Sequence, residues 1–229
     1  MNDLYTLLRT QSYAGRGIII GTTPSGRSVF AYFIMGRSAS SRARRFTESG
    51  EDIVIKNIGG DPQHPELILY APVRKLDGRT IVTNGDQTDT IYEALRLGGS
   101  FESALMTRAF EPDPPHFTSR ISCLTEPCGS YALSILKPAD REGSVCVREF
   151  FRYERQPCHG HYIHTYAGTE HTAQGDVLTP FAGEPYEVNI PDDLREFADL
   201  VWNGINEENK VALAVRDMQS GETIIINKY

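Results

Sequence analysis

The chain has 229 residues, of which 40% are hydrophobic and 23% are charged, and its formal net charge is −7. This composition fits one large or two small globular domains with a packed core. The negative balance disfavours a protein that binds nucleic acid, although a local arginine cluster can still hold an anion. No apolar run approaches the roughly 20 residues that cross a bilayer, so we expect no membrane segment.

The four cysteines are too few, in a chain of this size, for a disulfide scaffold. The first residues lack the basic start and apolar block that are typical of a secretory signal. We therefore expect reduced thiols and a cytoplasmic protein.

Strand-like runs dominate the first part of the chain. The apolar runs 15–21 and 28–35 flank a turn at 23–26 and predict a hairpin. Residues 36–45 predict a loop rich in serine and arginine. Further strands are expected over 52–56, 66–70 and 79–83, the second of them after the His64-Pro65 pair.

Two helices are expected next, over 86–97 and 100–110, and the proline-rich run 111–115 ends the second. In the first helix, one apolar face is predicted to carry Thr90, Ile91, Ala94, Leu95 and Leu97.

The remaining elements are strands over 119–123, 131–136 and 145–153, a helix from 191 to 202, and a hairpin of 211–216 with 223–227. Two groups of antiparallel strands with few helices predict an α+β fold, in which helices cover two packed sheets. We expect a single domain over residues 1–229.

Residues 83–91 join an Asn84-Gly85 turn to several small polar residues where a strand gives way to a helix. Backbone N–H groups and hydroxyls at such a junction can converge on a ligand. Asp86 or Asp89 could act there as a base, or could cap the helix.

Four arginines, Arg37, Arg42, Arg44 and Arg45, fall within nine residues, beside Ser38, Ser40 and Ser41. The planar guanidinium binds phosphate through two parallel hydrogen bonds, and serine hydroxyls add donors. Arg16 and Arg120 could reach the same ligand. The alternative is a solvated basic loop with separate surface arginines.

The later motifs leave two questions open. Glu170 could be a general acid or base, or a surface glutamate. Cys158, His159, His161, His164 and His171 have metal-binding chemistry, but their spacing matches no standard zinc site, so we expect no metal. The sequence lacks the usual motifs for nucleoside triphosphates, dinucleotides and serine hydrolases.

Taken together, the chain resembles the archaeal-type IMP cyclohydrolase family. The shared features keep one order between residues 13 and 185: Tyr13 to Arg16, Ala31-Tyr32, Arg37-Ser38 with Arg42, Asn84-Gly85, Thr88 to Ile91, Arg120-Ile121, Thr165-Tyr166 and Thr169-Glu170. Residues 1–12 and the stretch 158–164 look like departures from the family.

The resemblance implies a four-layer αββα sandwich of two antiparallel sheets, like that of the N-terminal-nucleophile hydrolases. This chain keeps Met1 and places no Cys, Ser or Thr as a processed first residue. We therefore expect no self-processing amidase chemistry.

The implied reaction converts 5-formamidoimidazole-4-carboxamide ribotide (FAICAR) to IMP, the last step of de novo purine synthesis, by ring closure with loss of water. The nucleophile belongs to the substrate, so neither cofactor nor metal is needed. The expected partner is a small ribotide, and the resemblance also implies a homo-oligomer.

The resemblance further suggests roles for single residues. Tyr70 matches a family tyrosine at the reacting atoms and is the expected acid; Arg37, Glu170 and Asp89 are the other catalytic candidates. The candidate substrate-binding residues are Arg16, Arg37, Ser38, Arg42, Asn84, Gly85, Thr88 and Arg120. The alternatives are a non-catalytic purine-nucleotide-binding protein, an amide hydrolase on the same fold and a zinc-binding module.

Overall fold

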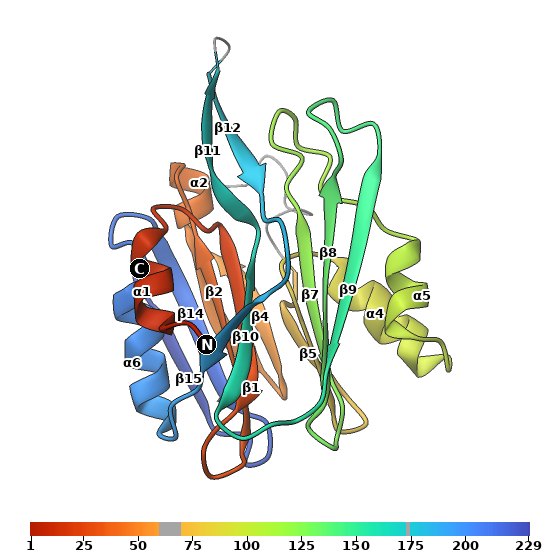
Figure 1. Ribbon diagram of the computed structural model, residues 1–229, viewed down its shortest axis with the longest axis vertical. Helices are drawn as coiled ribbons and strands as arrows, with labels where there is room; N and C mark the ends of the chain where they lie inside the picture. Colours follow the sequence, from red (N-terminus) through yellow and green to blue (C-terminus); the bar gives the residue numbers. More distant parts are fainter. Residues whose placement is uncertain (60–69, 173–174) are drawn as a thin grey trace.

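The computed structural model describes residues 1–59, 70–172 and 175–229. It is an α+β protein with two large antiparallel sheets and few helices. Figure 1 shows the two sheets side by side, with helices on their outer sides.

One sheet has six strands in the order β13-β10-β1-β2-β14-β15. The predicted first hairpin forms its centre, and the predicted last hairpin forms one edge. The strands are β1 (Arg16–Thr22), β2 (Ser28–Met35), β10 (His159–His164), β13 (Tyr186–Asn189), β14 (Lys210–Asp217) and β15 (Thr223–Asn227).

The other sheet has seven strands in simple chain order, β3 to β9. They are β3 (Arg44–Ser49), β4 (Asp52–Asn57), β5 (Val73–Leu76), β6 (Arg79–Thr83), β7 (Arg120–Thr125), β8 (Tyr131–Pro138) and β9 (Cys146–Tyr153). Strands β11 (Tyr166–Thr172) and β12 (Gly175–Pro180) form a separate hairpin that projects beyond both sheets (Figure 1).

Helices α1 (Leu4–Thr10) and α6 (Leu194–Gly204) pack together and cover the six-stranded sheet. Helices α4 (Gln87–Arg96) and α5 (Phe101–Met106) cover the seven-stranded sheet, and α2 (Ala39–Arg42) is a single turn. Side-chain caps fix several helix starts: Asp193 accepts a hydrogen bond from the Glu196 N–H at 2.7 Å.

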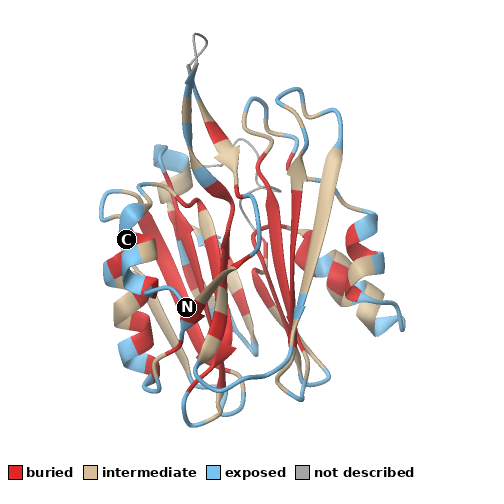
Figure 2. Cartoon of the chain, viewed as in Figure 1, coloured by how far each residue is buried: buried red, intermediate tan, exposed pale blue. Residues whose placement is uncertain are grey.

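Alternation along the strands sorts the core into separate clusters. On β1, Ile18 and Ile20 face the space between the sheets, whereas Ile19 faces α1 and α6. A third cluster, around Ile81 and Ile91, lies under α4 and α5. Figure 2 shows that buried residues are concentrated in the central strands of both sheets and on parts of the helices, whereas β9 and β15 are only partly buried.

Most predicted strands are confirmed to within two or three residues at each end, but residues 36–45 are not a simple loop. They contain α2, and β3 begins at Arg44. Ser38 caps α2 by accepting a hydrogen bond from the Ser41 N–H at 3.1 Å, so local side-chain bonds turn a polar loop into a helical turn.

The predicted helices are shorter in the structure. The second ends at Met106 rather than Phe110. Leu97 lies beyond the end of α4 and is 76% exposed, so its expected place on the buried face is wrong; the buried residues of α4 are Gln87, Thr88 and Ile91. The strand predicted over 66–70 lies outside the described residues except for Tyr70.

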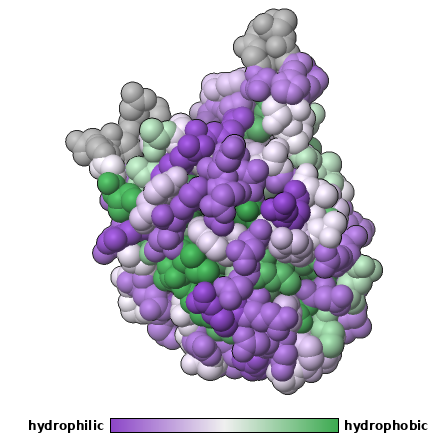
Figure 3. All heavy atoms as spheres, turned by 90° about the vertical axis from the view of Figure 1, so that its left-hand side faces the viewer, coloured by the Kyte–Doolittle hydropathy of each residue, from purple (hydrophilic) through white to green (hydrophobic). Residues whose placement is uncertain are grey.

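None of the helices in the described ranges is long and apolar enough to span a membrane. The face shown in Figure 3 is mainly hydrophilic, with separate hydrophobic patches.

Close backbone contact between β1 and β10 gives the first prediction. Gly21 pairs with Gly160, and a Cβ at Gly21 would lie 2.4 Å from the His159 carbonyl oxygen and 2.5 Å from the Gly160 Cα. Because backbone atoms cannot move aside cheaply, Gly21→Ala should lower the free energy of unfolding by about 3 kcal/mol in urea titration. Gly168→Ala, whose Cβ would have 3.6 Å to its nearest neighbour, should change it little; equal losses would contradict the explanation.

Candidate active site

A cluster of polar side chains lies at one end of the layer between the two sheets. Arg16 is in phase with Ile18 and Ile20 on β1, so it faces the seven-stranded sheet. Tyr32 on β2 and Tyr70 beside β4 bring their hydroxyl oxygens to 2.9 Å from each other. Both tyrosines are buried, and the Tyr70 carbonyl accepts a hydrogen bond from the Ile55 N–H. Chain segments 54 residues apart, carrying Arg16 and Tyr70, therefore share one polar environment.

Glu111 supplies an acid to this cluster. It is 4% exposed, its Oε1 has no hydrogen-bond partner, and its backbone N–H donates to the Thr118 carbonyl. Burial raises the pKa of Glu111 to about 7, against the opposing influence of Arg16 and Arg120. An acid that gains and loses a proton near neutral pH suits general acid–base catalysis.

Arg16 keeps its charge in this setting. Burial works against the charged form, but Tyr70, Tyr13 and Glu111 more than offset it, so the pKa of Arg16 is raised. Its Nε has no hydrogen-bond partner. The guanidinium can therefore donate a further hydrogen bond to an anionic or carbonyl ligand.

The rim of the cluster contains Arg37 and two stacked tyrosines. The Arg37 guanidinium lies 4.8 Å from the centre of the Tyr13 ring, and that ring stacks on Tyr166 at 5.9 Å. The Tyr166 hydroxyl is hydrogen-bonded to Thr118. Arg37 itself is exposed, so it is accessible to a ligand.

Ser38 and Arg42 have local partners. Ser38 is exposed and caps α2. The Arg42 Nε donates to the Gly36 carbonyl at 2.9 Å, and its Nη2 donates to Asn209 at 3.4 Å. The structure thus ties Arg42 to Gly36 before α2 and to Asn209 before β14, and neither partner belongs to the polar cluster.

The polar groups of the Asn84-Gly85 turn, called the corner below, form hydrogen bonds with other parts of the protein. Asn84 is fully buried, donates to the Ser119 carbonyl at 2.8 Å and accepts from the Ile121 N–H at 2.8 Å. The Thr88 hydroxyl donates to the Gly85 carbonyl at 2.9 Å. These contacts join β6, β7 and α4, so the polar residues expected to line a ligand form a structural corner.

Arg120 belongs to this corner too. Its Nη1 lies 2.7 Å from both Gln87 Oε1 and Asp86 Oδ1, on the side of the sheet that faces α4. A Cβ at Gly85 would lie 2.2 Å from Arg120 Nη1, so only glycine fits beneath the guanidinium. The positive charge of Arg120 lowers the pKa of Glu111 and partly opposes the effect of burial. Arg120 is therefore the electrostatic link between the corner and the polar cluster.

The two other predicted acids lie at the surface. Asp89 is ion-paired to Arg74 at 2.7 Å with its side chain 62% exposed, and Glu170 is ion-paired to Arg141. Their partners are not members of the cluster. The sequence analysis overlooked Glu111, because its place in a proline-rich run read as the end of a helix.

The histidines of the 158–171 stretch are dispersed. His161 accepts or donates a hydrogen bond with the Tyr131 hydroxyl at 2.7 Å and stacks on Tyr153, and burial lowers its pKa to about 4. His164 lies against Phe181. Within the described ranges, no three Cys, His, Asp or Glu side chains converge in a geometry that could hold a metal ion.

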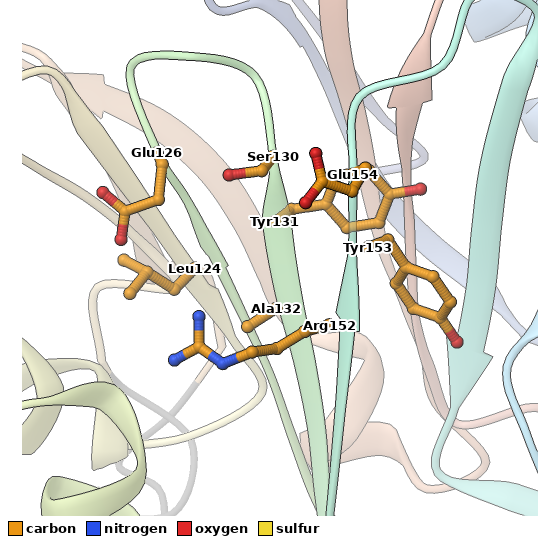
Figure 4. Close-up of a pocket in the computed structure, with 8 residues that line it drawn as sticks. All are labelled: Leu124, Glu126, Ser130, Tyr131, Ala132, Arg152, Tyr153 and Glu154. Atoms are coloured by element: carbon orange, nitrogen blue, oxygen red, sulfur yellow. The ribbon is translucent and has the colours of Figure 1, made fainter.

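A hollow of about 150 Å³ on the seven-stranded sheet is a weaker candidate (Figure 4). Two of its charged side chains already have partners: Arg152 pairs with Glu102, and Glu126 pairs with Arg79 at 2.9 Å. The unpartnered polar atoms of Arg16 and Glu111 make the cluster between the sheets the better site.

Comparison with known proteins gives a consistent picture. A family model described as IMP cyclohydrolase-like protein matches residues 13–222. An IMP cyclohydrolase of Methanocaldococcus jannaschii is 25% identical over 206 residues, covering 89% of this chain and 92% of the relative. An IMP cyclohydrolase of Methanopyrus kandleri is 29% identical over 143 residues, covering 57% and 72%.

The buried corner predicts a loss of stability on Asn84→Ala. The substitution leaves the Ser119 carbonyl and the Ile121 N–H unpaired in the interior, so the free energy of unfolding should fall by about 2–4 kcal/mol. Denaturant titration measures it. Asp89→Ala, which removes an exposed ion pair, should cost less than about 1 kcal/mol, and equal effects would mean that the corner is not structural.

Glu111 predicts a pH dependence. Its folded-state pKa of about 7 exceeds the ordinary 4.5, so the folded protein binds the proton more tightly than the unfolded chain. This stabilisation is present below pH 4.5 and is lost as the pH rises to 7. Relative to wild type, Glu111→Gln should therefore gain up to about 3 kcal/mol between pH 4.5 and 8 in urea titrations. Glu126→Gln is the control, and parallel curves for wild type and Glu111→Gln would contradict the assignment.

Proposed function

Because the chain belongs to the IMP cyclohydrolase-like family, we propose that it closes the purine ring of IMP from FAICAR. The match over residues 13–222, nearly the whole chain, carries this proposal. The polar cluster around Glu111, Tyr70 and Arg16 supports it, because ring closure needs an acid–base group beside donors for a carbonyl oxygen.

The reaction requires positioning and proton transfer. The carboxamide nitrogen of the ribotide attacks the carbon of its own formyl group, and a C–N bond forms. The nitrogen loses a proton and the formyl oxygen gains one. The C–O bond then breaks as the hydroxyl takes a second proton and leaves as water, while a ring nitrogen gives up its N–H proton and the C=N bond of the purine forms. Since nucleophile and electrophile share one molecule, the protein must hold the formyl group against the amide.

We propose Glu111 as the group that moves these protons. Its pKa of about 7 lets it take the amide proton as a carboxylate and return a proton to the departing hydroxyl. Its unpartnered, buried Oε1 is free to bond a substrate atom. Glu111 replaces Asp89 and Glu170 in this role, since both are ion-paired at the surface.

Tyr70 is the proposed donor to the formyl oxygen. Its hydroxyl is paired to Tyr32, which is held rigidly in the core by stacking on Phe46 at 5.5 Å. A hydroxyl fixed in this way can stabilise a developing oxyanion without having to reorient. Arg37, at the exposed rim beside Tyr13, would contact the ribotide as it enters.

We further propose that residues 1–229 form one domain with four αββα layers, like the N-terminal-nucleophile hydrolases. Three apolar clusters support the layering: one between the sheets and one between each sheet and its helices. A cytoplasmic homo-oligomer is part of the proposal, and it rests on the resemblance to the family.

The function is tested by incubating purified protein with FAICAR and following the absorbance of IMP. Wild type should turn over well above the uncatalysed rate. Glu111→Gln and Tyr70→Phe should each lower kcat by about 10²–10⁴-fold, because each removes a proton-transfer or oxyanion group. Glu126→Gln, at a paired glutamate outside the cluster, should retain wild-type kcat.

Three results would change the assignment. If Glu170→Gln loses turnover and Glu111→Gln does not, Glu170 rather than Glu111 is the group that transfers the protons. IMP binding without turnover would favour the non-catalytic purine-nucleotide-binding protein. An intact mass showing a trimmed chain with a new N-terminal nucleophile would favour the amide hydrolase.

A further inference from the structure

Strand β15 presents an open edge at the border of the six-stranded sheet (Figure 1). Among the described strands, only β14 pairs with it. Its sequence, Thr-Ile-Ile-Ile-Asn, contains no charged residue and no proline, and its pairing with β14 has no bulge. Charges, prolines and bulges are the features that normally keep an edge strand from pairing with another polypeptide.

The other borders of the two sheets are protected. At the opposite border of the same sheet, Asn2 forms a parallel bridge with Val188 of β13 and donates to the Glu187 carbonyl. Strands β3 and β9, at the borders of the other sheet, each carry arginines and a glutamate. Of the four borders of the two described sheets, that of β15 is therefore the one without such protection.

The hydrogen bonds to β14 show which backbone groups of β15 are already used. The Lys228 N–H donates to the Val211 carbonyl at 2.9 Å, and the Glu222 carbonyl accepts from the Asp217 N–H at 3.0 Å. In an antiparallel ladder, alternate residues bond to the same neighbour. The chain thus bonds to β14 through Glu222, Lys228 and the even-numbered residues between them.

The odd-numbered residues of β15 direct their backbone groups to the other side. Thr223, Ile225 and Asn227 each present one N–H donor and one carbonyl acceptor there. No strand in the described part of the chain pairs with that side, and none of the five residues of β15 is fully buried. The edge is therefore a template for one further strand.

The sequence of β15 is complementary to itself when read in the opposite direction. A second copy can lie antiparallel to the first, with the two Ile225 residues opposite each other. Thr223 of one copy then lies opposite Asn227 of the other. Ile224 lies opposite Ile226, and these two side chains share the face of the strand that packs toward α6. Apolar residues therefore meet apolar ones, and polar residues meet polar ones.

The charges that flank β15 match in the same register. The exposed Glu222 of one copy lies opposite Lys228 of the other, and this contact occurs twice in each dimer. Within the described ranges, Glu222 forms no ion pair, whereas Lys228 has a loose one with Glu207, at 3.9 Å. A shift of two residues would place Glu222 or Lys228 opposite an isoleucine, so the charges select this register.

We infer that the outer edge of β15 binds a second copy of this chain, which adds its own β15 and joins the two six-stranded sheets. The three outward residues of each strand supply about six backbone hydrogen bonds in all. Two-fold pairing uses up both edges, so the assembly closes as a dimer and does not extend through β15. The contact gives the homo-oligomer of the proposed function its interface, and it rests on that part of the proposal.

Charge reversal tests the register. Sedimentation equilibrium at rising protein concentration should show a wild-type dimer. Glu222→Lys and Lys228→Glu should each raise the dimer Kd by about 10- to 100-fold, because each turns two attractive contacts into repulsive ones. The double variant should regain most of the wild-type affinity, since it restores opposite charges. Glu142→Lys, exposed on the turn between β8 and β9, is the control for net charge and should keep the wild-type Kd.

Ile225→Pro tests the backbone pairing. The Ile225 N–H points away from β14, so proline removes a donor at the dimer centre and leaves the bonds to β14 in place. The variant should be folded by circular dichroism and monomeric. Hydrogen exchange reads the same contact in wild type: the Ile225 and Asn227 amides should exchange more slowly at dimer-forming concentrations than after dilution. If Ile225→Pro does not fold, hydrogen exchange decides.

The outcome is separable from that of the rest of the proposed function. A wild-type monomer that converts FAICAR would leave the chemistry standing and overturn the interface. An oligomer whose Kd is unchanged by both charge reversals would also overturn the interface, although the homo-oligomer would stand. A dimer that responds to these variants but does not convert FAICAR would support the interface and remove the cyclohydrolase proposal.

Discussion

Buried charge between two apolar sheets is the constraint on which the site depends. Most inward side chains of β1, β2 and β14 are aliphatic or aromatic, and they make a dry layer. In that layer the unpaired donor of Arg16 is worth more to a ligand than it would be in water.

The rest of the molecule holds the cluster in place. The Asn84 corner locks β6 to β7 and to the start of α4 through hydrogen bonds within the protein. The charge of Arg120 acts on Glu111 and favours its ionised form, and the Glu111 N–H is fixed by the Thr118 carbonyl. Proton transfer near neutral pH then follows from burial of one acid, with no metal in the proposed chemistry.

Sequence patterns predicted the local elements well and the site less completely. Short apolar runs placed β1, β2 and β8 closely, because strands that are buried on both faces are apolar along nearly their whole length. The roles of Asn84 and Thr88 were not predictable, since a turn that binds a ligand and a turn that bonds to its neighbours use the same residues. The complete burial of Arg44 was hidden among four arginines, although its phase with the buried Phe46 was a usable signal. Glu111 becomes apparent only in the fold, where it is buried and its charge acts on Arg16.

The end of the chain protects an exposed sheet edge. Strand β3 borders the seven-stranded sheet, and the side chain of Asn227 accepts a bond from the Phe46 N–H at 2.8 Å and donates to the Phe46 carbonyl at 3.1 Å. This single amide imitates an adjacent strand. It satisfies the two backbone groups of Phe46 that would otherwise be open to another polypeptide, so it opposes strand addition at this point of β3.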